Sequence, residues 1–596
     1  MVDSGSAPGP RASHSRAFAF GNLYLDSGGT LFRGEEIIHI PPKELAALQF
    51  LLAHAGHIVS AQQLKKALWP EVHVSDDSVS KCLSSLREFL SPDDCIQTVY
   101  KRGYRFVAEI RNIGTQADGN SPRLVIVPFA AEMNVAPYLG FSIAEETIAL
   151  LAGDPLSPIR ILARDSAFSL AARGIHAHKV GEMLQADLVL TGTLRSLPSH
   201  FRLRVEMIRV ADGTQIWVED MLVPQARVAG LESELAHRLF VRLGTCDPLQ
   251  SRPRSPALSR ADRPGHREAY ELFLLGHHEW QTLQRHRMQD GIEHLARAIE
   301  HDPALYEAHI DLANATVLQI LCGFAVPAQA AQQIRKIVES IPASVEGAEA
   351  ILPAMGWVRF HVDHDLVGAM RDFSASSHLP HETSITRFRT MFALSRHRFS
   401  EAITLLNDAL QSDPYSPWLN ARLAWAFHLA GESAKSVSQA EHALEIFPDH
   451  ACTNLYGSLI LAFNGNSDRA LAVSENLVRR LPNFDPATGV YGYALAQCGR
   501  LDEARSILER LQWLSRERFV LGSLTALICA ALGDTEGALA ELKTAAASRC
   551  PWFFQALADP RFASLHHHPE FATMRGILDQ MEKAAQKKST GSLGSS

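Results

Sequence analysis

Apolar residues recur at helical spacing in the third of three stretches near the start of the chain, over residues 75–90. These apolar positions fall within about 60° on a wheel of 100° per residue: Val79, Leu83, Leu86 and Leu90. The opposite face is polar, and its positions are Asp77, Lys81, Ser84, Ser85 and Glu88, with Ser80 and Arg87 at its edges. The pattern predicts an amphipathic helix that buries one face and exposes the other.

Two more helices and several short strands are predicted around this helix. One helical pattern begins at Pro41–Pro42, and a shorter one opens with the S-x-x-Q capping box of residues 60–63. Residues 18–40 alternate in the manner of strands, and residues 96–110 form two strand-like runs. Gly103 can take the positive φ that a tight turn between these two runs needs. We expect a small α+β domain that ends in a β-hairpin with a basic tip.

A second fold begins after the polar linker of residues 112–121. The run RLVIVPF from Arg123 is the short continuous apolar stretch of a buried strand. Helical spacing follows in residues 143–152, and strand-like stretches follow in residues 188–210. These patterns predict an α/β or α+β domain.

The second half of the chain repeats with a period of 34 residues. The period appears in Pro380, Pro414, Pro448 and Pro482 and in Gly431, Gly465, Gly499 and Gly533. Small residues keep the same register at Ala424, Ser458, Gly492 and Ala526 and at Ala402, Ser436, Ala470, Ala504 and Ala538. Proline would end the second helix of each pair, glycine would lie between the two helices, and small residues would let them approach. We expect a helical solenoid, with looser pairs over residues 266–380 and a cap that packs Trp552, Phe553 and Phe554 over the last repeat.

Length and composition fit several folded domains. The chain has 596 residues, of which 46% are hydrophobic and 20% charged, and at roughly 100–200 residues per domain three to five domains are expected. The formal net charge is −8, so any binding of nucleic acid must rest on a local surface. The eight cysteines form no C-x-x-C pair, which favours reduced thiols. No apolar stretch reaches the roughly 18–20 residues of a membrane span, and we expect a cytoplasmic protein without a membrane partner.

Residues 18–110 resemble the OmpR/PhoB-type winged-helix DNA-binding domain. Three motifs carry the resemblance in the family's order: PPKELAALQFLLAHAGHIVSAQQLKKALW, VSDDSVSKCLSSLREFL and IQTVYKRGYRFV. The KRGYRF wing is similar to the branch without a receiver domain, the CadC-like and HilA-like activators, and we expect no receiver before Phe18. The resemblance implies that the third helix enters the major groove and that the hairpin wing reaches the adjacent minor groove.

The resemblance also assigns roles to residues of that helix and wing. Base edges would face Lys81, Ser84 and Ser85, with Ser80 beside them. Phosphates would be contacted by Arg87, Lys101, Arg102 and Arg105. Many family members carry arginine where this chain has Ser84 and Ser85, so strong bidentate reading of guanine is not expected. The alternative interpretation is a polar face that is only solvated.

Residues 122–244 resemble the TolB-amino-terminal-like module through VIVPF, ARDS, ADLVLTGTLR and DGTQIWVED. The resemblance supplies no catalytic residues. Arg164 and Asp165 are candidates for binding a ligand, but a structural ion pair or loop contact is the favoured interpretation. The 34-residue period is the tetratricopeptide pattern, whose concave groove is a candidate surface for an unknown ligand or protein.

The sequence gives no support for an active site, a cofactor or a metal. It contains no G-x-x-x-x-G-K-[ST], G-x-G-x-x-G, G-x-S-x-G or H-E-x-x-H motif. The histidines of residues 277–278, 361–364 and 566–568 lack metal-site spacing with cysteines or carboxylates. We expect no enzyme, no cofactor and no metal ion.

These observations favour a cytoplasmic, sequence-specific DNA-binding transcriptional regulator whose middle and repeat domains receive a signal. The expected partners are double-stranded DNA, RNA polymerase or another protein, and a ligand or protein at the repeat groove, with a homo-oligomer as one option. The alternative is an interaction scaffold whose winged helix docks a protein, and salt-dependent duplex binding separates the two. A third class, an enzyme within residues 122–244, needs a ligand-filled pocket with perturbed ionisable groups.

The expected fold is multidomain: a winged helix-turn-helix (α+β), then a small α/β or α+β domain, then an all-α tetratricopeptide solenoid. The expected boundaries are a disordered leader at 1–16, the winged helix at 17–111, the module at 122–244, a linker at 245–265, the repeats with their cap at 266–585 and a disordered tail at 586–596.

Overall fold

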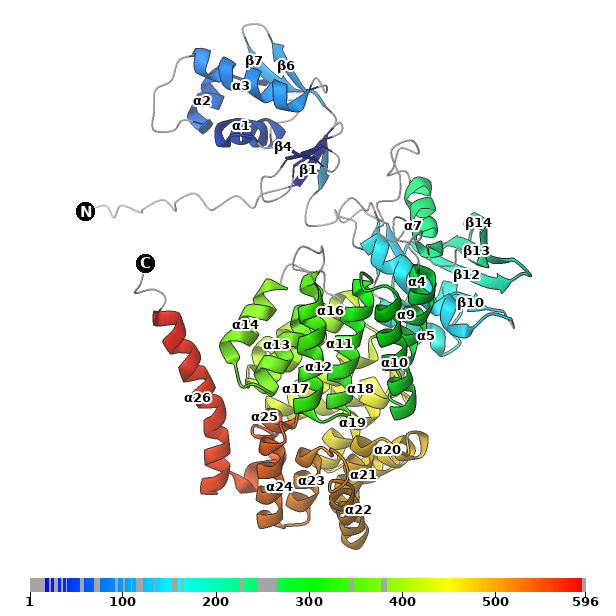
Figure 1. Ribbon diagram of the computed structural model, residues 1–596, viewed down its shortest axis with the longest axis vertical. Coiled ribbons are helices and arrows are strands. Elements are labelled where there is room, and N and C mark those ends of the chain that lie inside the picture. The colour runs from blue at the N-terminus through cyan, green and yellow to red at the C-terminus, as the bar shows by residue number, and fades with distance from the viewer. Residues whose placement is uncertain are drawn as a thin grey trace. The chain divides into compact units, whose positions relative to one another are not determined.

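The computed structural model describes the chain from residue 17 to residue 591, with gaps. The described residues are 17–20, 23–25, 31–33, 36–38, 40–53, 58–68, 76–91, 95–99, 102–108, 110–113, 122–132, 134–152, 159–162, 164–225, 230–243, 265–341, 348–376 and 383–591. The chain folds as two compact units, of which the first comprises Met1–Ser121 with Asp154–Arg160 and the second Pro122–Gly153 with Ile161–Ser596. Figure 1 labels their helices and strands.

The first unit is an α+β fold. In chain order its elements are β1 (Ala17–Phe20), β2 (Leu23–Leu25), β3 (Leu31–Arg33), β4 (Glu36–Ile38), α1 (Pro42–Ala53), β5 (Ile58–Val59), α2 (Ala61–Leu68), α3 (Asp76–Leu90), β6 (Ile96–Val99), β7 (Gly103–Phe106) and β8 (Ile110–Ile113). One sheet has the strand order β4-β3-β2-β1-β8 and the other β5-β7-β6. Residues Asn112 and Ile113 pair with β1, so the sheet extends into the segment that the sequence predicted to be linker.

An apolar core joins the helices of this unit to both of its sheets. Leu48 of α1 and Leu83 of α3 have no exposed surface. Phe20 of β1 and Phe106 of β7 pack edge to face with ring centroids 5.1 Å apart, which connects the two sheets through one core.

The capping box predicted at the start of α2 is confirmed. The backbone N–H of Gln63 donates to Ser60 Oγ at 3.2 Å, and the backbone N–H of Ser60 donates to Gln63 Oε1 at 2.9 Å. Each side chain therefore satisfies a backbone donor that the first helical turn leaves open.

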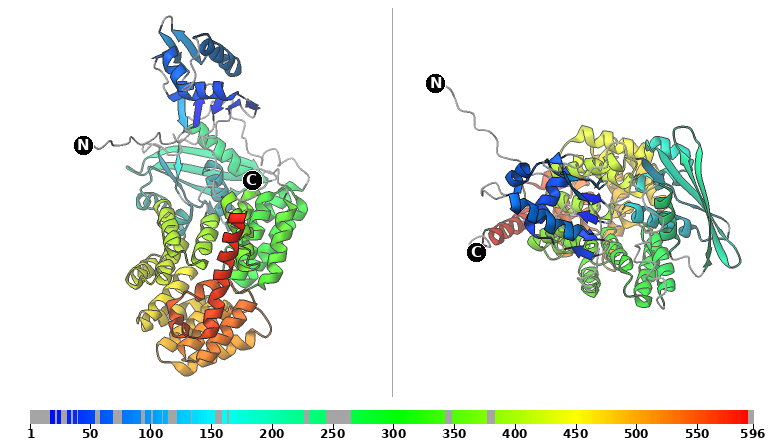
Figure 2. Two further views of the ribbon diagram at one scale, coloured as in Figure 1. Left: turned by 90° about the vertical axis from the view of Figure 1, so that its left-hand side faces the viewer. Right: turned by 90° about the horizontal axis from the view of Figure 1, so that it is seen from above.

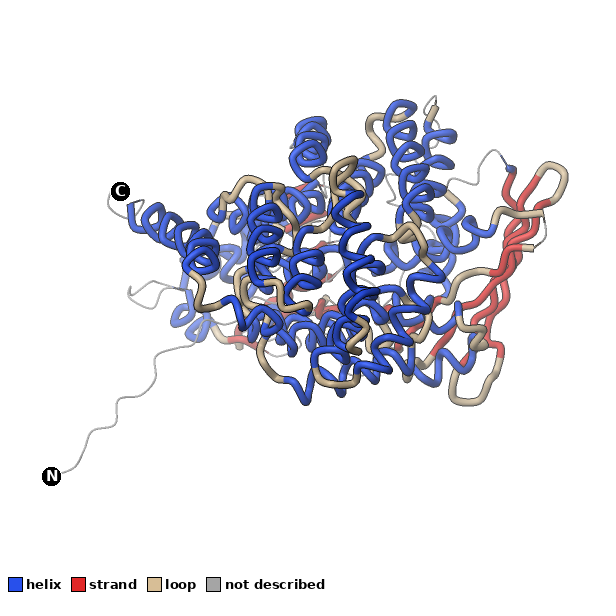
Figure 3. Tube along the Cα trace, turned by 90° about the horizontal axis from the view of Figure 1, so that it is seen from below, coloured by secondary structure: helices blue, strands red, loops and turns tan. Residues whose placement is uncertain are grey.

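The second unit begins with an α/β module. Its elements are β9 (Arg123–Ile126), β10 (Ala130–Ala131), α4 (Pro137–Ala152), β11 (Arg160–Ile161), α5 (Arg164–Ala172), α6 (Ala177–Met183), β12 (Leu188–Ser196), β13 (His200–Arg209), β14 (Gln215–Pro224) and α7 (Leu231–Arg242). The sheet order is β11-β9-β12-β13-β14; β9 and β10 run parallel to β12, and β12, β13 and β14 are antiparallel neighbours. In Figure 3 the long strands lie side by side at one edge of the helices.

Helical pairs follow over the rest of the chain. They are α9 (His266–Trp280), α10 (Arg285–His301), α11 (Tyr306–Leu321), α12 (Pro327–Ser340), α13 (Leu352–His361), α14 (Leu366–Ala375), α15 (Thr383–Ser395), α16 (Phe399–Ser412), α17 (Pro417–Leu429), α18 (Ser433–Ile446), α19 (Ala451–Phe463), α20 (Ser467–Arg480), α21 (Asp485–Gln497), α22 (Leu501–Leu514), α23 (Gly522–Ala531) and α24 (Thr535–Ala547). A 3-10 turn, η2 (Ala348–Ile351), precedes α13, and the last elements are α25 (Phe553–Ala556), the 3-10 turn η3 (Pro560–Leu565) and α26 (Pro569–Gly591).

The 34-residue register predicted from the sequence is confirmed from α16 to α24. The periodic glycines follow the first helix of each pair at φ values of +77° to +85°, a conformation that glycine adopts without strain. Pro414, Pro448 and Pro482 lie between the second helix of one pair and the first helix of the next. The small residues are buried where paired helices meet, and Ser436 Oγ donates to the carbonyl oxygen of Ala424 at 2.9 Å.

The aromatic cap was expected over the last repeat, and the structure extends its contacts much further. Trp552 stacks on Tyr456 of α19 with ring centroids 5.6 Å apart, and Trp552 Nε1 donates to the carbonyl oxygen of Leu321 in α11 at 3.3 Å. Phe554 packs on Phe360 of α13 at 5.0 Å. Helix α26, red in Figure 2, packs against both α14 and α24. The end of the chain therefore contacts both early and late repeats.

Gly492→Leu is expected to destabilise the repeats by about 1–3 kcal/mol, since a larger side chain has no space there. A Cβ atom at Gly492 in α21 would lie 2.7 Å from Ile507 Cγ2 and 2.8 Å from Ile528 Cδ1. Gly576→Leu in α26 is the matched control, because nothing lies within 4 Å of its Cβ position. Urea unfolding monitored by circular dichroism measures both variants. Equal midpoints for the two would contradict the close packing of α21 on its neighbours.

Candidate nucleic-acid interface and a buried polar junction

Helix α3 has the two faces that its sequence predicts. Val79, Leu83 and Leu86 have no exposed surface, and Leu90 is 1% exposed. The exposed side chains are Asp77, Ser80, Lys81, Ser84 and Glu88, while Ser85 and Arg87 are half-buried. The polar face therefore lies on the surface of the first unit, held in place by the core on its other side.

Two residues at the edge of that face contact the hairpin β6–β7. The hydroxyl oxygens of Ser80 and Tyr104 are 3.1 Å apart. Arg87 Nε and Nη2 donate to the carbonyl oxygen of Ile96 at 3.2 and 3.0 Å, and Nη2 also donates to Thr98 Oγ1 at 2.8 Å. These contacts connect the helix to the hairpin, so the polar face of α3 and the strands β6 and β7 form one surface.

The hairpin predicted from the sequence is confirmed. Gly103 opens β7 at φ +132°, and the exposed residue Arg102 donates its backbone N–H to the carbonyl oxygen of Val99 at 2.9 Å. Arg105 is half-buried and its Nη2 donates to Gln97 Oε1 at 2.7 Å. Lys101 lies outside the described residues. The structure thus brings Arg102 to the tip, whereas Arg105 lies along the strand and contacts its neighbour β6.

The thiol of Cys82 lies on the buried side of α3. Burial, with Glu44 nearby, raises the pKa of Cys82 to about 11. A thiol with that pKa is protonated at neutral pH and is a poor nucleophile. The residue is therefore part of the core, a role that the wheel of apolar positions did not include.

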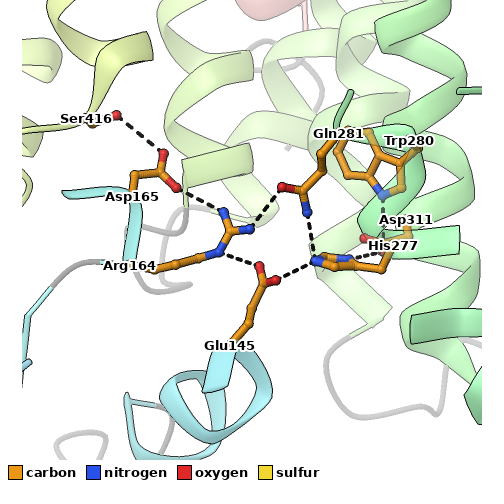
Figure 4. Close-up of polar contacts among 8 residues, drawn as sticks. All are labelled: Glu145, Arg164, Asp165, His277, Trp280, Gln281, Asp311 and Ser416. Atoms are coloured by element: carbon orange, nitrogen blue, oxygen red, sulfur yellow. Dashed lines mark hydrogen bonds and ion pairs between the residues drawn. The ribbon is translucent and has the colours of Figure 1, made fainter. Parts of the chain in front are cut away.

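A second polar cluster joins the α/β module to the repeats and is called here the polar junction (Figure 4). Its members are Glu145, Arg164, Asp165, His277, Trp280, Gln281, Asp311 and Ser416. Arg164 pairs with Glu145 at 2.6 Å and with Asp165 at 2.9 Å, and its Nη2 donates to Gln281 Oε1 at 2.9 Å. The structural ion pair favoured from the sequence for Arg164 and Asp165 is confirmed.

His277 of α9 is the second centre of the polar junction. Its Nε2 lies 2.8 Å from Glu145 Oε2, and its Nδ1 is hydrogen-bonded to Asp311. Burial opposes charge on His277, yet Asp311 and Glu145 raise its pKa well above the usual value. Burial also works against the ionised form of Glu145, but Arg164 and His277 hold its pKa at about 2. Two cations, Arg164 and His277, are thus paired with three carboxylates from the module and the repeats, and these contacts hold the two parts together.

The contact between the module and the repeats continues at Ser166, the last residue of the sequence ARDS. Its backbone N–H donates to Asp413 Oδ1 at 2.8 Å, and its hydroxyl accepts a hydrogen bond from the backbone N–H of Tyr415 at 2.7 Å. Sequence reasoning singled out Arg164 and Asp165 but missed their partners. The partners in the repeats are 117 to 251 residues further along the chain, and no spacing signal links them to Arg164 and Asp165.

In the described part of the chain, no group of three or more histidine, cysteine, aspartate or glutamate residues could hold a metal ion. No helix in the same ranges is both long and apolar enough to cross a membrane. None of the seven cysteines that the structure describes is in a disulfide.

Comparison with known proteins gives two family matches. The family described as "Transcriptional regulatory protein, C terminal" matches residues 34–106, which run from the first sheet to the end of β7. The family described as "Tetratricopeptide repeat" matches residues 486–510, which cover α21 and most of α22.

Individual relatives extend the comparison. Transcriptional regulator HilA of Salmonella typhimurium is 22% identical over 412 residues, which are 67% of this chain and 71% of HilA. Phosphate regulon transcriptional regulatory protein PhoB of Escherichia coli is 36% identical over 77 residues, 12% of this chain and 34% of PhoB. The DNA-binding domain of E. coli CadC is 24% identical and covers 17% of this chain and 99% of that domain, with a TM-score of 0.16. The chain therefore has an OmpR/PhoB-type winged-helix domain at residues 34–106, is similar over two thirds of its length to the transcriptional regulator HilA, and has a tetratricopeptide-like helical solenoid in its C-terminal half.

Proposed function

We propose that the protein regulates transcription by binding specific duplex DNA through α3 and the wing β6–β7, and that the α/β module and repeats form its sensor and protein-interaction region. The observation that carries the proposal is the exposed polar face of α3 beside a hairpin whose tip is basic. RNA polymerase or another protein is the proposed partner of the repeats. The proposed location is the cytoplasm, which holds the DNA that the protein would bind, and no enzymatic activity is proposed.

Each predicted site residue has a proposed role. Lys81, Ser84 and Ser85 contact base edges, and Ser80 supports them through Tyr104. The proposed phosphate contacts are Arg87, Lys101, Arg102 and Arg105. Arg87 and Arg105 are already hydrogen-bonded within the fold, which holds their guanidinium groups in position and reduces the side-chain entropy lost on binding.

The scaffold alternative makes a different prediction about salt. Neutralising phosphates with cations releases condensed counterions, so log K falls with log salt at a slope of about −0.9 per contact. Docking of a protein on the same face has no such fixed dependence. A duplex that binds without a salt slope, or that does not bind, favours the scaffold.

Changing Lys101 and Arg102 together to alanine is expected to reduce the magnitude of that slope by nearly 2, because about two phosphate contacts are removed. The full chain is titrated with a fluorescent duplex of its own promoter DNA at several salt concentrations. Lys179→Ala with Lys435→Ala is the matched control, since it removes two cations from exposed ion pairs of the second unit. An unchanged slope in the Lys101/Arg102 variant would show that the wing does not contact phosphate.

A further inference from the structure

A cavity lies between the first helices of several helical pairs, and the aromatic cap closes it on one side. It is lined by residues of α11, α15, α17, α19 and the segment before α25, together with the turn before α21. Its walls are mostly apolar and aromatic, with Leu318, Met391, Trp418, Tyr456 and Trp552 among them. The space open to the centre of a water-sized sphere is about 80 Å³. One water needs roughly 10–15 Å³ by this measure, so the cavity has room for a small molecule.

Two arginines line this apolar cavity, Arg387 of α15 and Arg422 of α17. Arg422 is only 3% exposed; its Nη1 donates to the hydroxyl of Tyr456, while its Nε and Nη2 are buried without a hydrogen-bond partner. The buried Nε of Arg387 also has no partner. Within the ranges that the structure describes, neither guanidinium has a carboxylate at ion-pair distance.

Aromatic rings stabilise part of the positive charge of these two guanidinium groups. The guanidinium carbon of Arg422 lies 5.2 Å from the ring centroid of Tyr456, and that of Arg387 lies 5.3 Å from that of Trp418. Burial lowers the pKa of Arg387, which Asp165 only partly offsets. A ring face attracts a cation but does not accept the hydrogen bonds that a guanidinium offers, so donors in the cavity remain unsatisfied.

Other buried arginines in the same unit differ from this pair. Arg561 pairs with Asp559, and Arg164 pairs with Glu145. Because a buried, unpaired cation is costly, most folds supply a partner. This cavity is apolar, and its two guanidinium groups have donors without a hydrogen-bond partner. It is therefore suited to bind an anion that is not part of the chain.

We propose that the cavity binds a small organic anion, a carboxylate with an apolar or aromatic body. Its carboxylate accepts hydrogen bonds from Arg387 and Arg422, and its body lies against Trp418, Tyr456 and Trp552. Two other polar side chains of the wall are engaged elsewhere: Trp552 Nε1 donates to the carbonyl oxygen of Leu321, and Gln555 Oε1 accepts from Trp425. Two open guanidinium groups match the two oxygens of one carboxylate.

The proposal deepens the sensor role of the repeats and rests on it for its biological meaning. A ligand changes DNA affinity only through its different affinities for the free and DNA-bound forms. Binding of the anion is measured without DNA. If the anion does not bind, duplex binding by the wing is unaffected. If the duplex does not bind, binding of the anion in the cavity is unaffected.

The test uses the full chain with sodium benzoate and sodium hexanoate as probes, and with benzamide and inorganic phosphate as comparisons. Tryptophan fluorescence measures binding, since Trp418 and Trp552 line the cavity. We expect saturable binding of a carboxylate probe, and Arg422→Met or Arg387→Met should weaken it about tenfold or more. Arg505→Met, which removes an arginine from an exposed pair, should bind as the unmodified chain does.

A second measurement separates a ligand role from a structural one. Without a carboxylate, Arg422→Met should melt at the same temperature as the unmodified chain or higher, because it removes an uncompensated buried cation. A lower melting temperature in both arginine variants would assign the pair to the fold. Equal binding of benzamide and benzoate, binding of phosphate alone, or carboxylate binding unaffected by both variants would overturn the proposal, as would the absence of saturable binding by either carboxylate.

Discussion

Gly103→Ala is expected to abolish duplex binding while the repeats stay folded. At Gly103 the backbone has φ +132°, and a Cβ atom there would lie 2.1 Å from the carbonyl oxygen of Val59 in β5. Strand β7 lies between β5 and β6, so the methyl group would force apart the sheet that carries the wing. The strained backbone and the collision together should cost more than about 3 kcal/mol, a large part of the roughly 5–15 kcal/mol that stabilises a typical domain.

Gly174→Ala is the control for backbone strain without collision. Gly174 has φ +76°, and nothing lies within 4 Å of its Cβ position. It should cost only about 1 kcal/mol and leave duplex binding unchanged. Electrophoretic mobility shift measures binding, and hydrogen exchange of residues 17–113 measures the stability of the first unit. Full duplex affinity in the Gly103→Ala protein would mean that the position of β7 against β5 does not support the wing.

Asp559→Asn is expected to destabilise the repeats by about 3–5 kcal/mol, since it leaves a buried arginine without its counter-charge. Asp559 is 2% exposed and accepts hydrogen bonds from Arg561 Nε at 2.9 Å and from His428 Nε2 at 3.1 Å. Arg561 in turn lies over the rings of Trp425 and Tyr493. An amide keeps the shape of the carboxylate but cannot balance the charge of this cluster.

The same ion pair predicts how the loss depends on pH. Burial opposes ionisation, but Arg561 and His428 hold the pKa of Asp559 well below its usual range. A carboxyl group whose pKa is lower in the folded state contributes its stability above the unfolded pKa of about 3.9 and loses it as the pH falls towards the folded pKa. The difference between the unmodified chain and Asp559→Asn should therefore be constant from neutral pH down to about pH 5 and shrink below about pH 4.

Asp502→Asn is the matched control for this charge change. Its partner Arg505 lies 2.7 Å away, but the Asp502 side chain is 97% exposed. An exposed pair contributes about 0–1 kcal/mol, so this variant should shift the unfolding midpoint little. Urea titrations followed by tryptophan fluorescence at several pH values measure both variants. A midpoint shift for Asp559→Asn no larger than that for Asp502→Asn would show that the pair does not stabilise the fold.

Local patterns predicted the elements well because those elements depend on local physics. The spacing of Val79, Leu83 and Leu86 predicted the buried face of α3, and the glycine period predicted the loops between paired helices. The capping box of Ser60 and Gln63 needs only neighbouring residues.

Contacts between distant segments could not be predicted in this way. Glu145 and His277 meet across 132 residues, and neither lies in a motif that names the other as a partner. The hydrogen bonds of Arg87 to Ile96 likewise depend on how β6 packs on α3, whereas the helical wheel showed only that Arg87 lies at the edge of a polar face. The roles of the individual residues in DNA binding stay predictions for the same reason. The helical wheel shows which residues are exposed, but it does not show which of them contact a base or a phosphate.

The contact between Trp552 and Leu321 has a consequence for how the protein is made on the ribosome. An open solenoid can add one repeat at a time as the chain emerges, because each repeat needs only its neighbours. Here a contact spans 231 residues, and Phe554 also reaches back to α13. At a synthesis rate of roughly 5–20 residues per second, the segment that covers α11 and α13 is made on the order of ten seconds or more after these helices. During that interval their apolar surfaces are open to chaperones or to other nascent chains, whereas the strands described in the first unit pair with one another within residues 17–113.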